Sequence, residues 1–223
     1  MSRFSLITFD CYGTLINWES GMKNALGDLA REKSLDIDIE ALPQRYIEIE
    51  LDIEQSGYRK YKEVLTLGVR RLFQEVGVEL SNQEETVFAD TINKWPPFEE
   101  THAVLKELKK NHGLAILSNI DDDIIRRSID LMGVEFDAVI TAEQVRSYKP
   151  SRRHWERALE VTRLPKEKIL HIAASYVHDI VPAKEMGFTT VWINRNNEKI
   201  TGDIRPDYEF ASLEPLLKLI SIT

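Results

Sequence analysis

The sequence predicts an α/β protein with a doubly wound parallel core sheet, helices on both faces of the sheet, and an inserted helical cap domain. Three observations predict this fold. Five short apolar segments, each followed by polar or turn residues, are typical of strands that are covered on both faces. Helical patterns alternate with the later strands, as in parallel sheets. After the first strand, roughly 75 residues show helical patterns and no strand pattern.

The core elements follow from local signals. Gly133 and Gly187 are suited to end helices, and Pro150 is suited to precede the start of one. The expected strands are Leu6–Phe9, Leu114–Leu117, Ala138–Ile140, Ile169–Ala173 and Thr190–Ile193. The expected core helices are Asp122–Met132, Ser151–Thr162 and Ile180–Met186.

The insert is expected to contain four helices. Apolar residues recur there at helical spacing, most clearly before Gly77. We therefore predict a core domain of residues 1–16 and 95–223 and a cap domain of residues 17–94. An insert at this point would lie over the carboxyl ends of the strands, where open α/β sheets bind ligands. The expected cap helices are Glu19–Lys33, Ala41–Gln55, Tyr58–Val76 and Gln83–Asn93.

Composition excludes several classes of function. The 223 residues are 43% hydrophobic and 30% charged, with a net charge of −8, which argues against nucleic acid as a partner. No apolar run approaches the roughly 18 residues of a membrane span, and no signal peptide is recognisable. Cys11 is the only cysteine, so no intrachain disulfide can form. We therefore expect a cytoplasmic protein.

Polar side chains follow four of the expected strands. Asp10, Ser118, Lys149 and Asp179 come after successive strands, whose carboxyl ends converge in a doubly wound sheet. Taken singly, each has an ordinary alternative: Asp10, Ser118 and Asp179 could cap turns or helices, and Lys149 could be a solvated loop residue. Taken together, they predict a site. Thr14 strengthens it, because its hydroxyl could hold the Asp10 carboxylate in one orientation.

This ordered set resembles the haloacid dehalogenase (HAD) superfamily. The resemblance covers nearly the whole chain, including the placement of the cap. The residues that carry it are Asp10 with Tyr12-Gly13-Thr14, Ser118-Asn119, Lys149-Pro150, and Asp179 followed by Ala183 and Gly187.

Two positions favour one subfamily. Phosphatases of the superfamily carry an acidic residue two positions after the nucleophile, where this chain has Tyr12, and many carry another where it has Ala174. A phenol with a pKa near 10 is a poor acid at neutral pH, and Mg²⁺ prefers carboxylate oxygens. The pattern is similar to the type II 2-haloacid dehalogenases, which implies no metal and no cofactor.

The resemblance implies roles for the site residues. Asp10 would attack C2 of a small 2-substituted carboxylate and form an ester that water hydrolyses. Lys149 would keep Asp10 ionised, and Ser118 and Thr14 would fix the attacking oxygen. Asp179 would either activate water or tether Lys149.

Further residues are expected to contact the substrate. They are Asn119 and Ser175, the Cys11 and Tyr12 positions beside the nucleophile, the cap arginine Arg45 as receiver of the leaving group, Trp18 and His178. The Cys11 thiol itself is expected to point to the opposite face of the strand. Arg45, Trp18 and His178 could equally be a solvated helix residue, hinge packing and an exposed helix-start residue.

Departures from the dehalogenase pattern leave the leaving group open. Ala174, Tyr176 and His178 replace a serine, an asparagine and a tryptophan of that family. Because an amine needs a proton to leave and a halide does not, the chain could resemble L-azetidine-2-carboxylate hydrolases. A Mg²⁺-dependent phosphatase of a small phosphate ester and a non-catalytic binding protein are the other hypotheses. By the same resemblance, a homodimer is possible.

Overall fold

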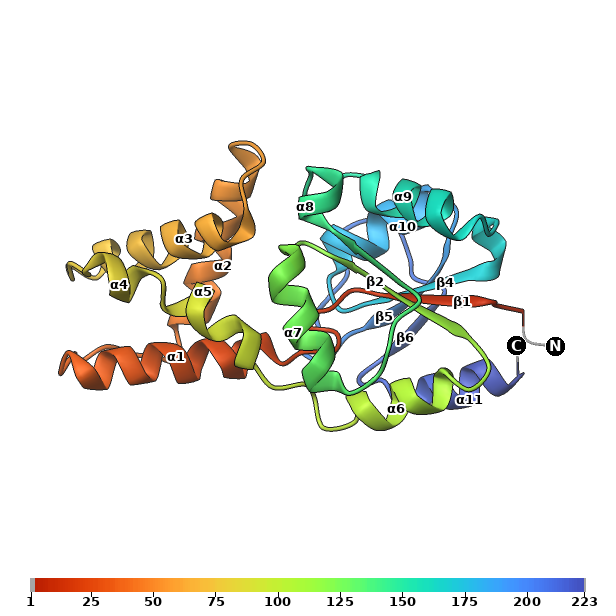
Figure 1. The fold of residues 1–223 in the computed structure, drawn as a ribbon, viewed down its shortest axis with the longest axis horizontal. Coiled ribbons are helices and arrows are strands. Elements are labelled where there is room, and N and C mark those ends of the chain that lie inside the picture. The colour runs from red at the N-terminus through yellow and green to blue at the C-terminus, as the bar shows by residue number, and fades with distance from the viewer. Residues whose placement is uncertain (1–2, 223) are drawn as a thin grey trace.

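The core is a six-stranded parallel sheet with the strand order β3-β2-β1-β4-β5-β6 (Figure 1). The computed structural model describes residues 3–222. The five expected strands are present, and every end agrees with its expected position to within one residue. The strands are β1 (Leu6–Phe9), β2 (Gly113–Ser118), β3 (Ala138–Thr141), β4 (Ile169–Ala173), β5 (Thr189–Ile193) and β6 (Tyr208–Phe210).

Helices cover both faces of this sheet, as predicted (Figure 1). One face packs on the apolar sides of α6, α7 and α11, and the other packs on α9 and α10, with Trp155 fully buried. Burial on both faces explains why the central strands are almost wholly apolar. The core helices are α6 (Thr101–Leu108), α7 (Asp122–Met132), α8 (Ala142–Val145), α9 (Arg153–Thr162), α10 (Val181–Glu185) and α11 (Pro215–Ile222).

Strand β6 and helices α6, α8 and α11 were not among the predicted elements. Strand β6 has three residues at the sheet edge, and none of them is fully buried, so it lacks an apolar run. Helix α8 has a single turn. Helix α6 does carry a readable signal, because Val104, Leu105 and Leu108 recur at helical spacing and are buried.

The helical insert, which we call the cap, projects from the carboxyl edge of the sheet (Figure 1). The predicted single helix Gln83–Asn93 is wrong, because the chain forms three short helical segments there. Ser81 and Glu84 form a capping box that starts the first segment, and the Thr86 hydroxyl bonds the Gln83 carbonyl near its end. The cap elements are α1 (Trp18–Glu32), α2 (Leu42–Gln55), α3 (Tyr61–Glu75), α4 (Asn82–Glu85), α5 (Val87–Thr91) and η1 (Ile92–Lys94).

The two chain crossings between core and cap are paired. Ile16 and Pro97 form an antiparallel bridge, and the Asn17 amide donates to the Pro96 carbonyl at 2.8 Å. Asp121 adds a second tie, because its carboxylate accepts hydrogen bonds from the backbone amides of Tyr61 and Lys62 at 2.9 and 3.0 Å. A core carboxylate therefore caps the first turn of α3, where the helix dipole favours negative charge.

None of the helices within residues 3–222 has the length and apolar character that a membrane crossing requires.

Candidate active site

Asp10 lies at the carboxyl end of β1, and a tight loop holds its carboxylate. Its backbone amide donates to the Ile172 carbonyl of β4 at 3.0 Å. The Thr14 hydroxyl donates to Asp10 Oδ2 at 2.8 Å and accepts the Ala174 amide at 2.8 Å. Because Thr14 accepts one hydrogen bond and donates the other, Asp10 Oδ2 serves as an acceptor, as in a carboxylate.

The loop depends on a glycine. Gly13 has φ of +93°, and a Cβ at this position would come within 2.9 Å of Trp18 Nε1. Trp18, the first residue of α1, therefore covers the turn of the nucleophile loop. From outside, Arg195 holds the same loop by donating to the Thr14 carbonyl at 2.9 Å.

Lys149 reaches the end of β1 from the loop that follows β3 and α8. Its ammonium donates to Asp10 Oδ1 at 2.8 Å, to Asp179 Oδ1 at 2.7 Å and to the Leu117 carbonyl at 3.0 Å. The side chain is only 2% exposed, so all three donors are used inside the protein. The structure thus brings the ends of β1, β2 and β4 together on one cation.

Asn119 positions this lysine. The Asn119 side-chain amide accepts the Lys149 backbone N–H at 2.7 Å and donates to the Lys149 carbonyl at 3.2 Å. The amide therefore pairs with the backbone of the loop, and its expected contact with substrate stays a prediction. Ser118 is buried at the end of β2, and its carbonyl contacts His154 Nε2 at 3.2 Å.

Asp179 lies in a π-helical turn, η3 (Tyr176–Ile180), just after β4. Besides Lys149, its Oδ1 contacts His171 Nε2 at 3.2 Å, and His171 Nδ1 contacts the Thr8 hydroxyl at 2.9 Å. Thr8 and His171 are paired across β1 and β4. A polar chain beneath the site therefore fixes the position of Asp179.

The three central charges are strongly coupled. Burial raises the pKa of Asp10, and the charge of Lys149 opposes this rise without cancelling it. Burial acts against the Lys149 charge, but the two carboxylates outweigh it and raise the lysine pKa. Burial also acts against the Asp179 charge, yet Lys149 and His171 lower the pKa of Asp179 to about 2. Asp179 is therefore ionised at neutral pH, tethers Lys149 and is a weak base.

Cys11 and Tyr12 have neighbours other than the Asp10 carboxylate. The Cys11 side chain is fully buried in the apolar core, as expected, and burial raises the pKa of its thiol. The Tyr12 hydroxyl is hydrogen-bonded to Ser128 Oγ of α7 at 2.7 Å, and burial raises its pKa well above 10. Tyr12 thus cannot replace the carboxylic acid that phosphatases have at this position.

Ser175 and His178 lie together at the start of η3. Ser175 Oγ contacts His178 Nδ1 at 3.0 Å and accepts the His178 backbone amide at 3.2 Å. Burial lowers the pKa of His178, although the charge of Asp179 opposes this. A neutral, oriented imidazole beside Asp179 can accept a proton from water.

The prediction that Arg45 faces the substrate is wrong. Its guanidinium is half exposed and forms two hydrogen bonds to Glu75, the last residue of α3. Tyr61, the first residue of α3, is the one tied to the core. A helical rise of 1.5 Å per residue separates these ends by about 21 Å. Arg45 therefore lies at the end of the cap that is remote from Asp10.

Sequence reasoning missed three residues that hold the site together: His171, Asp121 and Arg195. His171 had a signal, because it is a polar residue inside the apolar strand Ile169–Ala173. Asp121 and Arg195 had none, since each acts on a segment far away in the chain.

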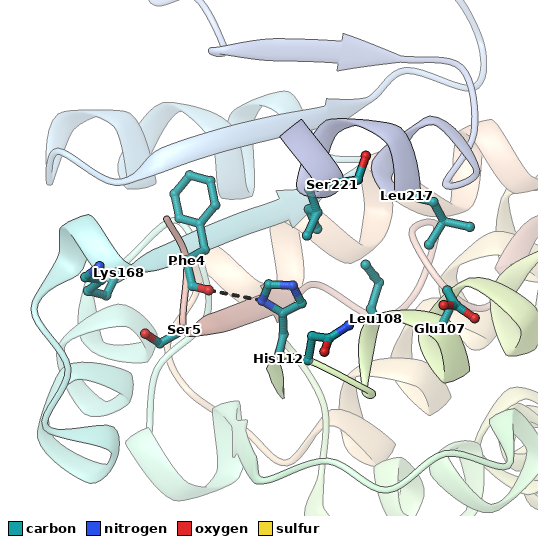
Figure 2. A pocket seen from close by; sticks show the side chains of 10 residues that line it. Phe4, Ser5, Glu107, Leu108, His112, Lys168, Leu217 and Ser221 are labelled. Atoms are coloured by element: carbon teal, nitrogen blue, oxygen red, sulfur yellow. Dashed lines mark hydrogen bonds between the residues drawn. The ribbon is translucent and has the colours of Figure 1, made fainter. Parts of the chain in front are cut away.

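The hollow shown in Figure 2 lies at the opposite edge of the sheet. It has a volume of about 770 Å³ and is lined at the amino ends of the strands by Phe4, His112, Lys168 and Ile220. His112 Nδ1 contacts the Phe4 carbonyl at 3.0 Å there. Parallel sheets bind substrates at their carboxyl edge, so this hollow is not the catalytic site.

Comparison with known proteins identifies the family. The model of the haloacid dehalogenase-like hydrolases matches residues 4–187. The chain belongs to this family. The (S)-2-haloacid dehalogenase of Pseudomonas sp. (strain YL) is 28% identical over 233 residues, which cover 96% of this chain and 93% of that protein. Haloacetate dehalogenase H-2 of Moraxella sp. (strain B) is 25% identical over the full length of both chains.

Solved structures of this hydrolase family share the fold. The L-2-haloacid dehalogenase of Xanthobacter autotrophicus superposes with a TM-score of 0.87 at 20% identity, covering 98% of both chains. YfnB of Bacillus subtilis, a HAD-hydrolase solved bound to magnesium, gives 0.83 at 19% identity, covering 98% and 99%. A dehalogenase and a magnesium-bound hydrolase fit almost equally well. The fold therefore leaves the chemistry to the site residues.

The site residues of this haloacid dehalogenase-like hydrolase do not fit a magnesium ion. Mg²⁺ would need oxygen ligands in octahedral array between Asp10 and Asp179. The Lys149 ammonium bonds an oxygen of both carboxylates, and Ala174 offers no side-chain oxygen. Within residues 3–222, no three His, Cys, Asp or Glu side chains are gathered in an arrangement that could hold a metal.

Proposed function

We propose that the protein is a metal-independent hydrolase that displaces a leaving group from C2 of a small 2-substituted carboxylic acid through an ester on Asp10. The observation that carries this proposal is the Lys149 ammonium between Asp10 and Asp179, at 2.8 and 2.7 Å. Opposite unit charges about 3 Å apart attract by about 5 kcal/mol at an effective dielectric constant of about 20. A lysine at this position supports an ionised nucleophile without a metal.

In the first step, an Asp10 carboxylate oxygen attacks C2 of the substrate. The bond between C2 and the leaving group breaks, and its electron pair departs with that group. Attack from the opposite side inverts the configuration at C2. Hydrogen bonds from Thr14 and Lys149 hold the attacking carboxylate in one orientation, which lowers the entropic part of the barrier.

In the second step, water attacks the carbonyl carbon of the Asp10 ester. The bond between that carbon and the ester oxygen breaks, so the product 2-hydroxy acid keeps the oxygen that came from Asp10. His178 accepts the proton of the attacking water, since its imidazole is neutral and oriented by Ser175. Asp179 holds Lys149, which remains charged throughout.

The leaving group is a halide or a ring amine. The names of the relatives support a halide, because both are dehalogenases. A ring amine stays open because Ala174, Tyr176 and His178 depart from the dehalogenase pattern. Opening of L-azetidine-2-carboxylate is therefore the second reaction to test.

The test is turnover in the presence of EDTA. The purified protein is incubated with each enantiomer of 2-chloropropionate and with L-azetidine-2-carboxylate, beside the Asp10→Asn variant. We expect hydrolysis of at least one acid, unaffected by EDTA and lost in the variant. Hydrolysis of a generic phosphate ester that EDTA abolishes would establish a phosphatase instead. No turnover of any compound would favour a binding protein.

A further inference from the structure

Two glutamates of the cap lie one helical turn apart on α2 without a cation. Glu50 and Glu54 are both partly accessible to solvent. Within residues 3–222, the ion pairs of the cap join other side chains, and neither of these carboxylates lies within 4 Å of a lysine, arginine or histidine nitrogen. Carboxylates at i and i+4 on a helix repel each other. The pair therefore does not stabilise helix α2.

The pair lies on the side of the cap that contacts the core. Glu50 Oε1 accepts a hydrogen bond from the Tyr61 hydroxyl at 2.6 Å. The Tyr61 ring packs 6.4 Å from the ring of Tyr148, the residue before Lys149. The charge of Lys149 also acts on Glu54 directly. The two carboxylates thus lie near the junction between cap and core, where Tyr61 is tied to Asp121.

A buried hydroxyl beside the pair lacks a partner. Tyr46 is 0% exposed, and no described residue hydrogen-bonds its hydroxyl. It lies one turn before Glu50 on the same face of α2, and the charges of Glu50 and Glu54 act on that hydroxyl. Buried polar groups normally have a partner, so an unpaired hydroxyl within the field of two carboxylates points to a ligand there.

Both carboxylates have raised pKa values. Burial raises the pKa of Glu50 to about 7, although the Tyr61 hydrogen bond opposes the rise. Burial and the charge of Glu50 raise the pKa of Glu54 to about 9, against the lowering effect of Lys149. A bound cation would replace such protons, because it stabilises both ionised forms.

We propose that Glu50 and Glu54, with the Tyr46 and Tyr61 hydroxyls, form a subsite for an ammonium group of the substrate. The subsite makes the cap select 2-substituted carboxylic acids that also carry a cationic nitrogen. A nitrogen with three or two N–H donors can bond both carboxylates and the Tyr46 oxygen at once. This proposal rests on the proposed function, since the substrate's reacting carbon must lie at Asp10.

The test is a pair of stable product analogues that differ only in charge. 4-Amino-2-hydroxybutyrate and 2-hydroxypentanoate have the same shape, with an ammonium in place of a methyl group. Calorimetric titration of the wild-type protein should show the cationic acid binding at least tenfold more tightly. Glu50→Gln and Glu54→Gln should each weaken it about tenfold and change binding of the neutral acid less than twofold. Glu48→Gln, on the exposed side of α2, is the matched control and should change neither.

A second readout separates recognition from structural support. At pH 8, binding of the cationic acid should release protons, measured in buffers of different ionisation enthalpy, and Glu54→Gln should reduce that release. Equal affinity for the two acids, an equal loss for both in Glu54→Gln, or no binding of either acid would overturn the proposal. The EDTA turnover assay with 2-chloropropionate stands apart from this result. If it succeeds while charge selection fails, only the ammonium subsite is wrong.

L-Azetidine-2-carboxylate distinguishes two sources of the ammonium. If the nitrogen that binds the cap is also the leaving group, Glu54→Gln should lower kcat/KM for this ring about tenfold and leave 2-chloropropionate unchanged. If azetidine turnover is unchanged while 4-amino-2-hydroxybutyrate still depends on Glu54, the subsite binds a distal side-chain ammonium. If neither compound depends on Glu54, the proposal fails.

Discussion

The core site and the cap each bring two carboxylates together, and they differ in how the charge is balanced. In the core, Lys149 lies between Asp10 and Asp179 and bonds both. In the cap, no basic side chain among residues 3–222 pairs with Glu50 or Glu54, and the pKa values of these two carboxylates rise instead. A permanent cation produces a fixed, charged nucleophile. A carboxylate pair without one holds protons and is open to a cation from outside.

Removing the core cation should give the largest effect. Lys149→Met leaves two buried carboxylates uncompensated, which typically costs about 3–5 kcal/mol. We expect a loss of that size in the free energy of unfolding, measured with urea, and at least about a thousandfold loss of turnover. Lys184→Met breaks the partly exposed pair with Asp207 and is the matched control, with an expected loss below about 1 kcal/mol. Wild-type stability of Lys149→Met would show that the core charges are not coupled.

Removing a cap carboxylate should raise the free energy of unfolding, whereas removing the core cation lowers it. The pKa of Glu54 lies above its unfolded value of 4.5, so the folded protein binds more protons between about pH 4.5 and 9. This contribution is full below pH 4.5 and is lost as the pH rises toward 9. Glu54→Gln should therefore become more stable relative to wild type by on the order of 3 kcal/mol between pH 5 and pH 7, and the difference should continue to grow toward pH 9. Urea unfolding at pH 5, 7 and 9 measures it, and a constant difference would contradict a raised pKa.

Removing the Thr14 hydroxyl should have an intermediate effect, seen in the turnover at the core site. Thr14→Val removes the donor to Asp10 Oδ2 and the acceptor of the Ala174 amide. We expect kcat to fall about 10- to 100-fold, which corresponds to about 1–3 kcal/mol. Thr14→Ser should recover most of the activity, because it keeps the hydroxyl. A Thr14→Val variant with wild-type kcat would mean that this bond does not orient Asp10.

The loss of activity at low pH should report protonation of Asp10 and not of Asp179. The folded-state pKa of Asp10 is raised above 3.8, so activity should fall as the pH drops through a value higher than that of an ordinary aspartate. The pKa of Asp179 is about 2, so this residue should not titrate in the same range. The pH dependence of kcat/KM measures the limb. Full activity down to pH 4 would contradict the raised pKa.

Removing the Asp121 tie between cap and core should give the smallest effect. Asp121→Ala removes the carboxylate that caps α3, and caps are worth about 1 kcal/mol. Stability should fall by about that amount, and KM should rise more than kcat falls, because the cap residues would be held less firmly over Asp10. Asp123→Ala is the control, since its carboxylate pairs with the exposed Lys62 ammonium. Equal effects of the two substitutions would mean that Asp121 holds the cap no more firmly than Asp123 does.

The sequence predicted the sheet and the core site better than the cap. Strands buried on both faces leave plain apolar runs, and the polar residues that end them converge by topology alone. Asp10, Thr14, Lys149 and Asp179 were accessible to this reasoning. The cap residues were not accessible to it, because a polar helix face has the same sequence pattern whether it faces a site or solvent. Arg45 was therefore placed wrongly, and Glu50 and Glu54 were passed over.

The most direct measurement of the central claim is one turnover cycle in ¹⁸O-water, followed by mass spectrometry of the peptide that contains Asp10. If the substrate forms an ester on Asp10 and water attacks the carboxyl carbon, the peptide gains ¹⁸O and the first product molecule carries none. Label in the first product with an unlabelled Asp10 peptide would mean that water attacks the substrate directly, and it would contradict an aspartyl ester as the intermediate.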